Sequence, residues 1–330
     1  MNKFKVAVFS SKPYDQKSFC QQLNDSIEME FFDVRLTDKS VDLAKGSDAV
    51  CVFVNDELTK SVLTKLNDFG VKGIALRCAG FNNLDLPSFE HLPIRAARVP
   101  AYSPEAVAEH AIALMMTLNR KLHKAYNRTK EDNFSLNGLL GFNMHQKTVG
   151  IIGTGKIGLA TIKILNGFGA NVIAYDPYPS TLAKQLNFEY VTLNQLLNQS
   201  DVISLHCPLN ADTQHIIDKT ALAKMKPGVM LINTSRGGLI DTSCVIDALK
   251  TGQIGHLGLD VYEQESELFF EDHSTSIVQD DVFQRLLTFP NVLITGHQGF
   301  FTGEALSQIA QTTMYNLNCF LNDTNCDNEI

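Results

Sequence analysis

Residues 148–158 read TVGIIGTGKIG, an apolar run followed by a glycine-rich turn and the start of a helical pattern. The three glycines of the turn, Gly153, Gly155 and Gly158, have the spacing G-x-G-x-x-G. In this pattern the first glycine permits a tight turn, the second lets a ligand approach the backbone, and the third lets the helix pack against the strand. Unpaired N–H groups and a partial positive charge at the start of a helix favour an anion. The stretch therefore predicts a phosphate-binding turn between a strand and a helix.

The sequence after this turn indicates the kind of phosphate ligand. A second apolar run, residues 171–175, ends at Asp176, about 20 residues beyond the glycines, where an acidic side chain accepts hydrogen bonds from an adenosine ribose. A carboxylate at this place repels a 2′-phosphate, so we expect the cofactor to be NAD rather than NADP. The residues expected to bind it here are Gly153, Thr154, Gly155, Gly158 and Asp176.

The length and charge of the chain limit what it can be. Its 330 residues exceed the roughly 250–300 at which a single core stops growing, so two domains are expected. The 28 basic and 36 acidic residues give a net charge of −8 without any basic run, which argues against nucleic acid and membrane surfaces as partners. The N-terminal residues lack the features of a signal peptide, and no apolar run approaches the ~18 residues of a membrane span. We therefore expect a cytoplasmic protein.

The spacing of cysteines and histidines indicates neither a metal site nor a disulfide framework. The seven cysteines are scattered without a C-x-x-C pair, and the nine histidines lack a metal-binding spacing such as H-E-x-x-H. We expect reduced thiols and no bound metal.

Short apolar runs alternate with helical patterns along most of the chain, which predicts an α/β fold with parallel sheets. We expect two Rossmann-like or flavodoxin-like domains. A helix over residues 105–128 should cross between them, and a helix over 303–321 should return to the first. The sequence thus predicts a discontinuous substrate (catalytic) domain, residues 1–100 and 299–330, into which an NAD-binding Rossmann domain, residues 101–298, is inserted. The expected strands are residues 5–9, 49–54, 73–77, 148–152, 171–175, 202–205, 229–232, 256–259 and 292–294.

Polar residues follow several of these strands, at the sheet edge where ligands bind in open α/β folds. Arg236 offers a planar fork that can hold a carboxylate and polarise a neighbouring carbonyl. His297 is the natural acid and base because the pKa of an imidazole ordinarily lies near neutrality. From spacing alone, Glu265 and Glu263 could each pair with that imidazole. His110, in an apolar part of the long helix, is expected to be a packing residue.

Several segments together carry a resemblance to a known family. They are residues 77–83 (RCAGFNN), 99–110 (VPAYSPEAVAEH), 153–158 (GTGKIG), 233–237 (NTSRG), 260–263 (DVYE) and His297. On these residues the chain resembles the D-2-hydroxyacid dehydrogenases, and within them the fermentative NAD-dependent D-lactate dehydrogenases. The resemblance implies an oxidoreductase that reduces pyruvate to D-lactate by hydride transfer from NADH, with His297 as proton donor. It also implies a homo-oligomer, a dimer or a tetramer.

The resemblance also assigns residues to roles. The implied catalytic residues are Arg236, Glu265 and His297. The further cofactor contacts it implies are Lys156, Ile157, Cys207, Pro208, Thr213, Thr234, Ser235, Arg236 and Asp260. The implied substrate-binding residues are Phe53, Cys78, Ala79, Gly80, Tyr102, Arg236, His297 and Phe300. Many family members carry proline where this chain has Gly296, which loosens the backbone beside His297.

Two other functions are compatible with these motifs. The chain could act on larger, branched or aromatic 2-oxoacids, which differ only in the size of the pocket they need. It could also be an NAD-sensing, corepressor-like interaction protein, since such proteins can retain the catalytic residues. The absence of long disordered extensions favours the enzyme.

Overall fold

The structure is a computed structural model that describes residues 3–265 and 268–330. The chain forms two compact units, one from Met1–Ser103 with Phe301–Ile330 and the other from Pro104–Phe300. Each unit contains one parallel sheet, of five and seven strands respectively, so the predicted α/β fold class is confirmed. The predicted domain boundaries, after residues 100 and 298, lie close to the limits of these units, and the substrate-binding role given to the first unit stays a prediction.

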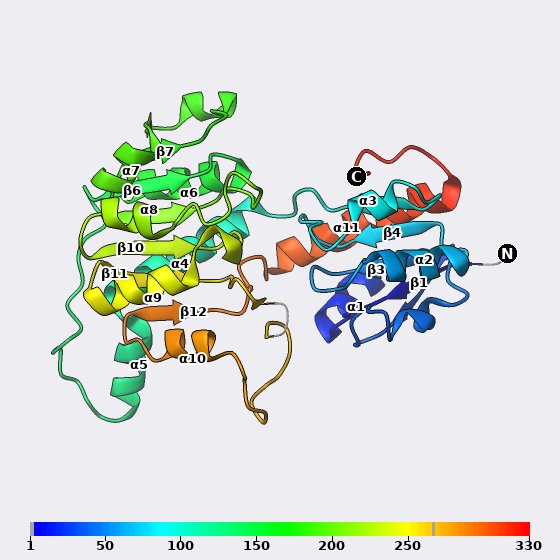
Figure 1. The fold of residues 1–330 in the computed structure, drawn as a ribbon, viewed down its shortest axis with the longest axis horizontal. Helices are drawn as coiled ribbons and strands as arrows, with labels where there is room; N and C mark the ends of the chain where they lie inside the picture. The colour runs from blue at the N-terminus through cyan, green and yellow to red at the C-terminus, as the bar shows by residue number, and fades with distance from the viewer. Residues whose placement is uncertain (1–2, 266–267) are drawn as a thin grey trace. The chain divides into compact units, whose positions relative to one another are not determined.

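The first unit is a five-stranded parallel sheet with helices on both faces (Figure 1). The strand order is β2-β1-β3-β4-β5. Its strands are β1 (Phe4–Val8), β2 (Ile27–Phe31), β3 (Ala49–Val52), β4 (Gly73–Leu76) and β5 (Arg95–Arg98), and its helices are α1 (Pro13–Cys20), α2 (Lys60–Asp68), α3 (Leu86–Phe89), α11 (Gly303–Asn322) and the 3-10 turn η1 (Val41–Ala44). Apolar side chains of α2 pack on one face, and those of α1 and α11 pack on the other. The last helix lies so close to β4 that a Cβ atom on Gly73 would be 2.4 Å from the Phe320 ring.

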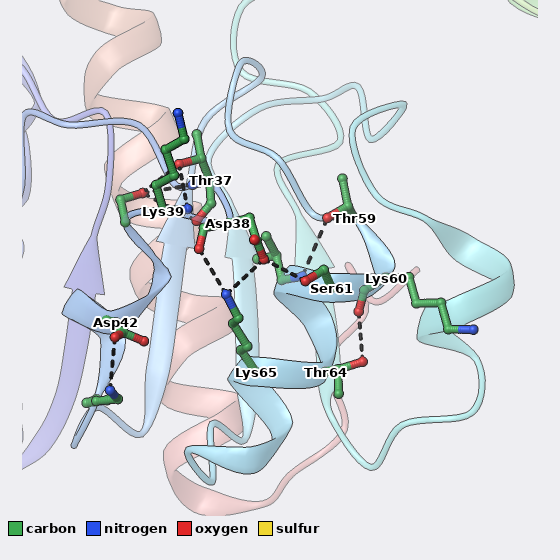
Figure 2. A network of polar contacts seen from close by, with 12 residues as sticks. Thr37, Asp38, Lys39, Asp42, Thr59, Lys60, Ser61, Thr64 and Lys65 are labelled. Carbon is green, nitrogen blue, oxygen red and sulfur yellow. Dashed lines mark hydrogen bonds and ion pairs between the residues drawn. The ribbon is translucent and has the colours of Figure 1, made fainter.

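A surface network in the first unit ties the segment after β2 to α2 (Figure 2). Thr59 caps the start of α2. The Ser61 hydroxyl donates to the Asp38 carboxylate, and the Lys65 ammonium lies 2.9 Å from the same carboxylate. These hydrogen bonds, led by that of Ser61, hold the pKa of Asp38 below its ordinary value. Ion pairs this exposed contribute little to stability, so the network mainly orders the loop.

The second unit is a seven-stranded parallel sheet in the order β12-β11-β10-β9-β6-β7-β8. Its strands are β6 (Thr148–Ile152), β7 (Asn171–Tyr175), β8 (Glu189–Tyr190), β9 (Val202–Leu205), β10 (Val229–Asn233), β11 (Ile254–Leu259) and β12 (Val292–Ile294). Its helices are α4 (Pro104–Arg120), α5 (Leu122–Lys130), α6 (Lys156–Gly167), α7 (Leu193–Gln199), α8 (Lys219–Lys224), α9 (Thr242–Thr251) and α10 (Asp281–Leu287), with 3-10 turns η2 (Thr181–Gln185) and η3 (Gly237–Leu239). Apolar residues of α4 and α6 cover one face of the sheet, and those of α7, α8, α9 and α10 cover the other. Both faces are therefore buried, as a parallel sheet requires.

The structure differs from the sequence-based expectation in two respects. The single helix expected over residues 105–128 is two helices, because Lys121 adopts a left-handed backbone conformation, with φ of 51°, between α4 and α5. Three strands, β2, β5 and β8, were not expected. In the edge strand β2 only Ile27 is buried and exposed glutamates alternate with the apolar residues, and β8 has only two residues, so neither shows a continuous apolar run.

The described residues contain free thiols and lack both a metal-binding cluster and a helix that could span a membrane. All seven cysteines are free thiols. No group of histidine, cysteine and acidic side chains in residues 3–265 and 268–330 has the geometry to hold a metal ion. Over the same residues, no helix combines the length and apolar character needed to cross a membrane.

Candidate active site

The glycine-rich turn lies between β6 and α6, as its sequence predicts. Gly153 has φ of 97°, and a Cβ atom there would lie 2.6 Å from the Cys207 nitrogen, so only glycine fits. A Cβ atom on Gly158 would lie 2.0 Å from the Gly153 carbonyl oxygen. Gly155 differs from both, because no described residue apart from its neighbours along the chain has an atom within 4 Å of the place its Cβ would take. The turn is thus tightly packed at two glycines and open at the middle one, where α6 begins.

Asp176 follows β7 and binds the glycine-rich turn directly. Its Oδ2 atom accepts hydrogen bonds from the Thr154 backbone N–H at 2.7 Å and from the Thr154 hydroxyl at 2.9 Å. Its Oδ1 atom accepts one from the Tyr178 N–H at 2.8 Å. Tyr190, on β8, donates a hydrogen bond from its hydroxyl to the Thr154 hydroxyl. The carboxylate predicted to bind a ribose therefore also fixes the phosphate-binding turn.

The ends of β9 and β10 carry the other residues predicted to contact the cofactor. The Ser235 hydroxyl donates to the Cys207 carbonyl oxygen at 2.6 Å, which links the two strand ends. The Thr213 hydroxyl donates to the Pro208 carbonyl oxygen at 2.6 Å and closes the loop after β9. The Thr234 hydroxyl is buried and has no hydrogen-bond partner in the described part of the chain. A buried hydroxyl without a partner and an open helix start fit a polar ligand with phosphates.

Arg236 lies in the turn that joins β10 to α9. Its guanidinium donates to the Ser235 carbonyl oxygen at 2.7 Å, and the Asn233 side chain donates to the Arg236 carbonyl oxygen at 2.8 Å. The next residue, Gly237, packs directly on the backbone after β11, since a Cβ atom there would lie 2.1 Å from the Tyr262 carbonyl carbon. The position of the guanidinium thus depends on how this turn packs against β11.

The structure pairs His297 with Glu265, not with Glu263. Nδ1 of His297 lies 2.8 Å from Oε1 of Glu265, and each side chain is 16% exposed. Oε2 of Glu265 accepts a hydrogen bond from the Tyr262 N–H at 2.9 Å, which orients the carboxylate. Because the carboxylate engages Nδ1, the other ring nitrogen, Nε2, is left to exchange a proton with a substrate. The dyad has the geometry of an oriented general acid and base.

Asp260 fixes the loop that carries His297. Its carboxylate accepts hydrogen bonds from the N–H groups of Gln298 and Gly299, and its carbonyl oxygen accepts one from the His297 N–H at 2.7 Å. His297 has φ of 53°, a backbone conformation that residues other than glycine seldom adopt, and these hydrogen bonds offset the local strain. These bonds hold the loop although Gly296, directly before His297, loosens the backbone.

Burial alone would raise the pKa of Asp260. The hydrogen bonds from His110, Thr295 and Gln298 outweigh burial and hold the pKa of this carboxyl below its ordinary value. His110 was expected only to pack among apolar side chains. Its Nε2 atom instead lies 3.0 Å from the Thr295 hydroxyl and 3.2 Å from the Asp260 carboxylate. Its place on an apolar helix face hid this polar contact from sequence reasoning.

The substrate-binding residues predicted in the first unit follow β3 and β4. The Phe53 ring is stacked on the fully buried Arg77 guanidinium, 4.8 Å from ring centroid to Cζ. The turn after β4 is held by Arg98, which donates to the Ala79 carbonyl oxygen at 2.8 Å. Cys78 donates from its thiol to the Gly80 carbonyl oxygen at 3.2 Å. Sequence reasoning did not identify the supporting roles of the two arginines, because each depends on neighbours distant in sequence.

The remaining predicted residues are divided between the units. Tyr102 belongs to the first unit, together with Phe53 and the turn after β4. Phe300 is buried in the second unit, together with Arg236 and His297. The roles given to all of these residues stay predictions.

Comparison with known proteins assigns this chain to a family. The sequence profile of the D-isomer specific 2-hydroxyacid dehydrogenase NAD-binding domain matches residues 112–299. The chain belongs to the D-isomer specific 2-hydroxyacid dehydrogenases. Its cofactor is therefore NAD, and the oxidoreductase class expected from the sequence is confirmed.

Individual members of the family match the chain over nearly its whole length. It is 56% identical to a D-lactate dehydrogenase of Escherichia coli over 328 residues, which cover 99% of both chains. The solved structure of a Salmonella D-lactate dehydrogenase is 56% identical, with a TM-score of 0.86 and 99% of both chains covered. A structure described as the pyruvate reductase of Chlamydomonas reinhardtii is 44% identical, with a TM-score of 0.93, and covers 99% of this chain and 98% of that one.

Proposed function

We propose that this dehydrogenase is an NAD-dependent D-lactate dehydrogenase that reduces pyruvate to D-lactate. The observation that carries the proposal is the Glu265–His297 pair, at 2.8 Å, at the same sheet edge as Arg236 and the glycine-rich turn. The full-length identity to D-lactate dehydrogenases supports the choice of substrate within the family.

The residues of the second unit divide the work of the reaction. NADH, when bound, supplies the hydride that adds to the carbonyl carbon. Arg236 binds the substrate carboxylate and draws electron density from the carbonyl. His297 donates the proton from Nε2 to the carbonyl oxygen, and Glu265 stabilises the protonated imidazole through Nδ1. In lactate oxidation the same nitrogen accepts the proton.

The first unit supports the assignment of substrate size. Phe53 follows β3 with its ring supported by Arg77, so it offers a fixed apolar surface. We propose that Phe53, Tyr102 and Phe300 limit the space for the substrate methyl group, and that N–H groups of the turn after β4 bind its carboxylate. Larger 2-oxoacids should then react less efficiently.

We also propose that the protein is a homo-oligomer, a dimer or a tetramer. In Figure 1, α5 and the coil after it extend away from the seven-stranded sheet. No residue of α5 is buried, and this region exposes Tyr126, Phe134, Leu136 and Leu140. Apolar residues gathered in one exposed region are typical of protein–protein contacts. Light scattering should give a mass of two or four chains, and a single-chain mass would contradict the proposal.

The function is tested by following NADH absorbance after pyruvate is added and by assaying the product for D-lactate. His297→Gln should lower kcat by roughly 10²–10⁴-fold while NADH still binds. A His297 variant with nearly normal kcat would assign the proton transfer to another group. An unaltered protein that prefers phenylpyruvate or 2-oxoisocaproate would be a dehydrogenase of larger substrates, and one that yields L-lactate would refute the assignment.

Glu265→Gln tests the partner of the imidazole. A hydrogen bond to a charged group contributes roughly 1 kcal/mol more than a neutral one, and 1.36 kcal/mol corresponds to a tenfold change in equilibrium. Glu265→Gln should therefore lower kcat for pyruvate by roughly five- to tenfold, because the neutral amide stabilises the protonated imidazole less. An unchanged kcat would mean that Glu265 does not act on His297.

A further inference from the structure

Glu263, the acid that sequence reasoning left as an alternative partner of His297, makes a second contact between a histidine and a carboxylate. Its Oε1 atom lies 2.6 Å from Nε2 of His215. Its Oε2 atom accepts a hydrogen bond from the Thr242 hydroxyl at 2.8 Å. The His215 and Glu263 side chains are 37% and 30% exposed, so the contact is half-buried. Each carboxylate oxygen thus holds a different segment of the chain.

Both of these segments adjoin the turn that carries Arg236. Thr242 is the first residue of α9, directly after the turn. The His215 backbone N–H donates to the Gly238 carbonyl oxygen at 2.9 Å. Two further backbone bonds continue this pairing, from Ile217 to the Leu239 carbonyl oxygen and from Asp241 to the Ile217 carbonyl oxygen. The turn is therefore enclosed between the loop after β9 and the end of β11.

We propose that Glu263 is a positioning residue for Arg236. Its carboxylate joins His215 and Thr242 to the end of β11, and so fixes the turn from which the guanidinium extends toward the substrate carboxylate. The inference rests on the proposed function of Arg236 as the substrate clamp. Two acids of one segment then serve different parts of the reaction: Glu263 sets the position of Arg236, and Glu265 orients His297.

The geometry around Arg236 explains why this support matters. The Arg236 guanidinium donates a hydrogen bond to the carbonyl oxygen of the preceding residue, Ser235. Because Ser235 belongs to the same turn, this bond moves with the turn and does not fix it. Gly237 packs directly on the backbone of Tyr262 and Glu263, so a shift there is passed to the preceding residue. A bidentate hold on a carboxylate is sensitive to small displacements of the guanidinium. A loosened turn should therefore weaken substrate binding more than proton transfer.

Asp241 is a second charged group near His215. Hydrogen bonds from Ser243 and Cys244, aided by the nearby His215, lower the pKa of Asp241 to about 2. Asp241 also caps the start of α9. Asp241 therefore stays an anion, and its hydrogen bonds stabilise the start of α9. The carboxylate that contacts the His215 ring is that of Glu263.

The test compares Glu263→Ala and Glu263→Gln with two reference variants in the holoenzyme. Glu265→Gln is the reference for a change in proton transfer. Asp247→Ala, which removes an exposed carboxylate on α9 paired with Lys250, is the matched control. The measurements are KM and kcat for pyruvate across pH, the affinity of the NADH complex for oxamate, the affinity for NADH, and the melting temperature.

Glu263→Ala should raise the KM for pyruvate and weaken oxamate binding by about tenfold or more, while kcat falls by less than about threefold. Its pH profile should match that of the unaltered enzyme, and its NADH affinity should stay within about twofold. Glu263→Gln should recover most of the loss, because an amide can still accept from Thr242 and bond to His215. Asp247→Ala should change none of these quantities.

Three results would overturn the inference. A kcat lowered as in Glu265→Gln, at unchanged KM, would mean that Glu263 acts on His297. A lower melting temperature with unchanged KM would make Glu263 a structural residue only. An equal loss of NADH and oxamate affinity would show that the substitution displaces the loop after β9 and not the turn that carries Arg236.

If the unaltered protein reduces no 2-oxoacid, the proposed function fails and the inference fails with it. If pyruvate is reduced but KM is unaffected, the inference alone fails.

Discussion

The Asp176 carboxylate has two roles: its charge disfavours NADPH, and its hydrogen bonds hold the glycine-rich turn. Variants that remove one role at a time show which of them sets the preference for NADH. The carboxylate accepts two hydrogen bonds from Thr154 in the glycine-rich turn, at 2.7 and 2.9 Å, and it lies at the strand end where the adenosine ribose is expected. Asp176→Asn removes the charge and keeps an acceptor oxygen. Asp176→Ala removes both. The two variants therefore distinguish charge from tethering.

The charge determines the preference between NADH and NADPH. Two like charges 4 Å apart repel by about 4 kcal/mol at an effective dielectric constant of 20, so relief from this repulsion is worth up to a few kcal/mol. With partial solvent screening, we expect Asp176→Asn to raise kcat/KM for NADPH by roughly 10–100-fold, which corresponds to about 1.4–2.7 kcal/mol. The same variant should use NADH somewhat less well.

The hydrogen bonds determine the shape of the turn. Bonds to a charged acceptor contribute about 1.5–3 kcal/mol each, so Asp176→Ala should weaken binding of both cofactors, beyond the change in preference. The assay is kcat/KM for NADH and NADPH at saturating pyruvate, together with a direct titration of NADH fluorescence. The chain contains no tryptophan, so NADH can be followed without indole emission. Equal use of both cofactors by the unaltered protein, or no gain for NADPH in Asp176→Asn, would refute the reasoning.

Three further predictions concern single residues. Arg236→Lys keeps the charge and loses the planar fork, so kcat/KM for pyruvate should fall by roughly 10–100-fold at unchanged NADH affinity; normal kinetics with a lower melting temperature would make Arg236 structural. Phe53→Ala should raise kcat/KM for 2-oxobutyrate relative to pyruvate, within the roughly 10–200-fold range that one methylene allows, and an unchanged ratio would place Phe53 outside the pocket. Burial lowers the pKa of His206 to about 4, so the unfolded chain takes up a proton that the folded chain does not between pH 6.5 and 4. The free energy of unfolding should therefore fall by up to roughly 3 kcal/mol as the pH drops through this window, and His206→Gln should flatten the loss measured by urea unfolding.

The sequence by itself determined the features that depend on local patterns. The apolar runs of β6 and β7, the glycines between them and Asp176 follow one another at short intervals, so the cofactor-binding turn could be predicted along with the parallel α/β class. The positive φ of Gly153 could be predicted from the residue itself, because glycine adopts this conformation readily. Elements with weak local patterns were missed, among them the half-exposed edge strand β2 and the break at Lys121.

Only the tertiary structure decided which side chains of the site meet. Glu263 and Glu265 are two residues apart and chemically identical, and spacing could not say which one pairs with His297. The choice follows from the positions of His215 and Thr242, which engage Glu263 from two other segments. In the same way, Asp260 holds the His297 loop through backbone N–H groups, a contact that depends on β11 and β12 lying side by side. A sequence pattern specifies the conformation of one segment, whereas contacts between segments depend on how the whole sheet brings its strand ends together.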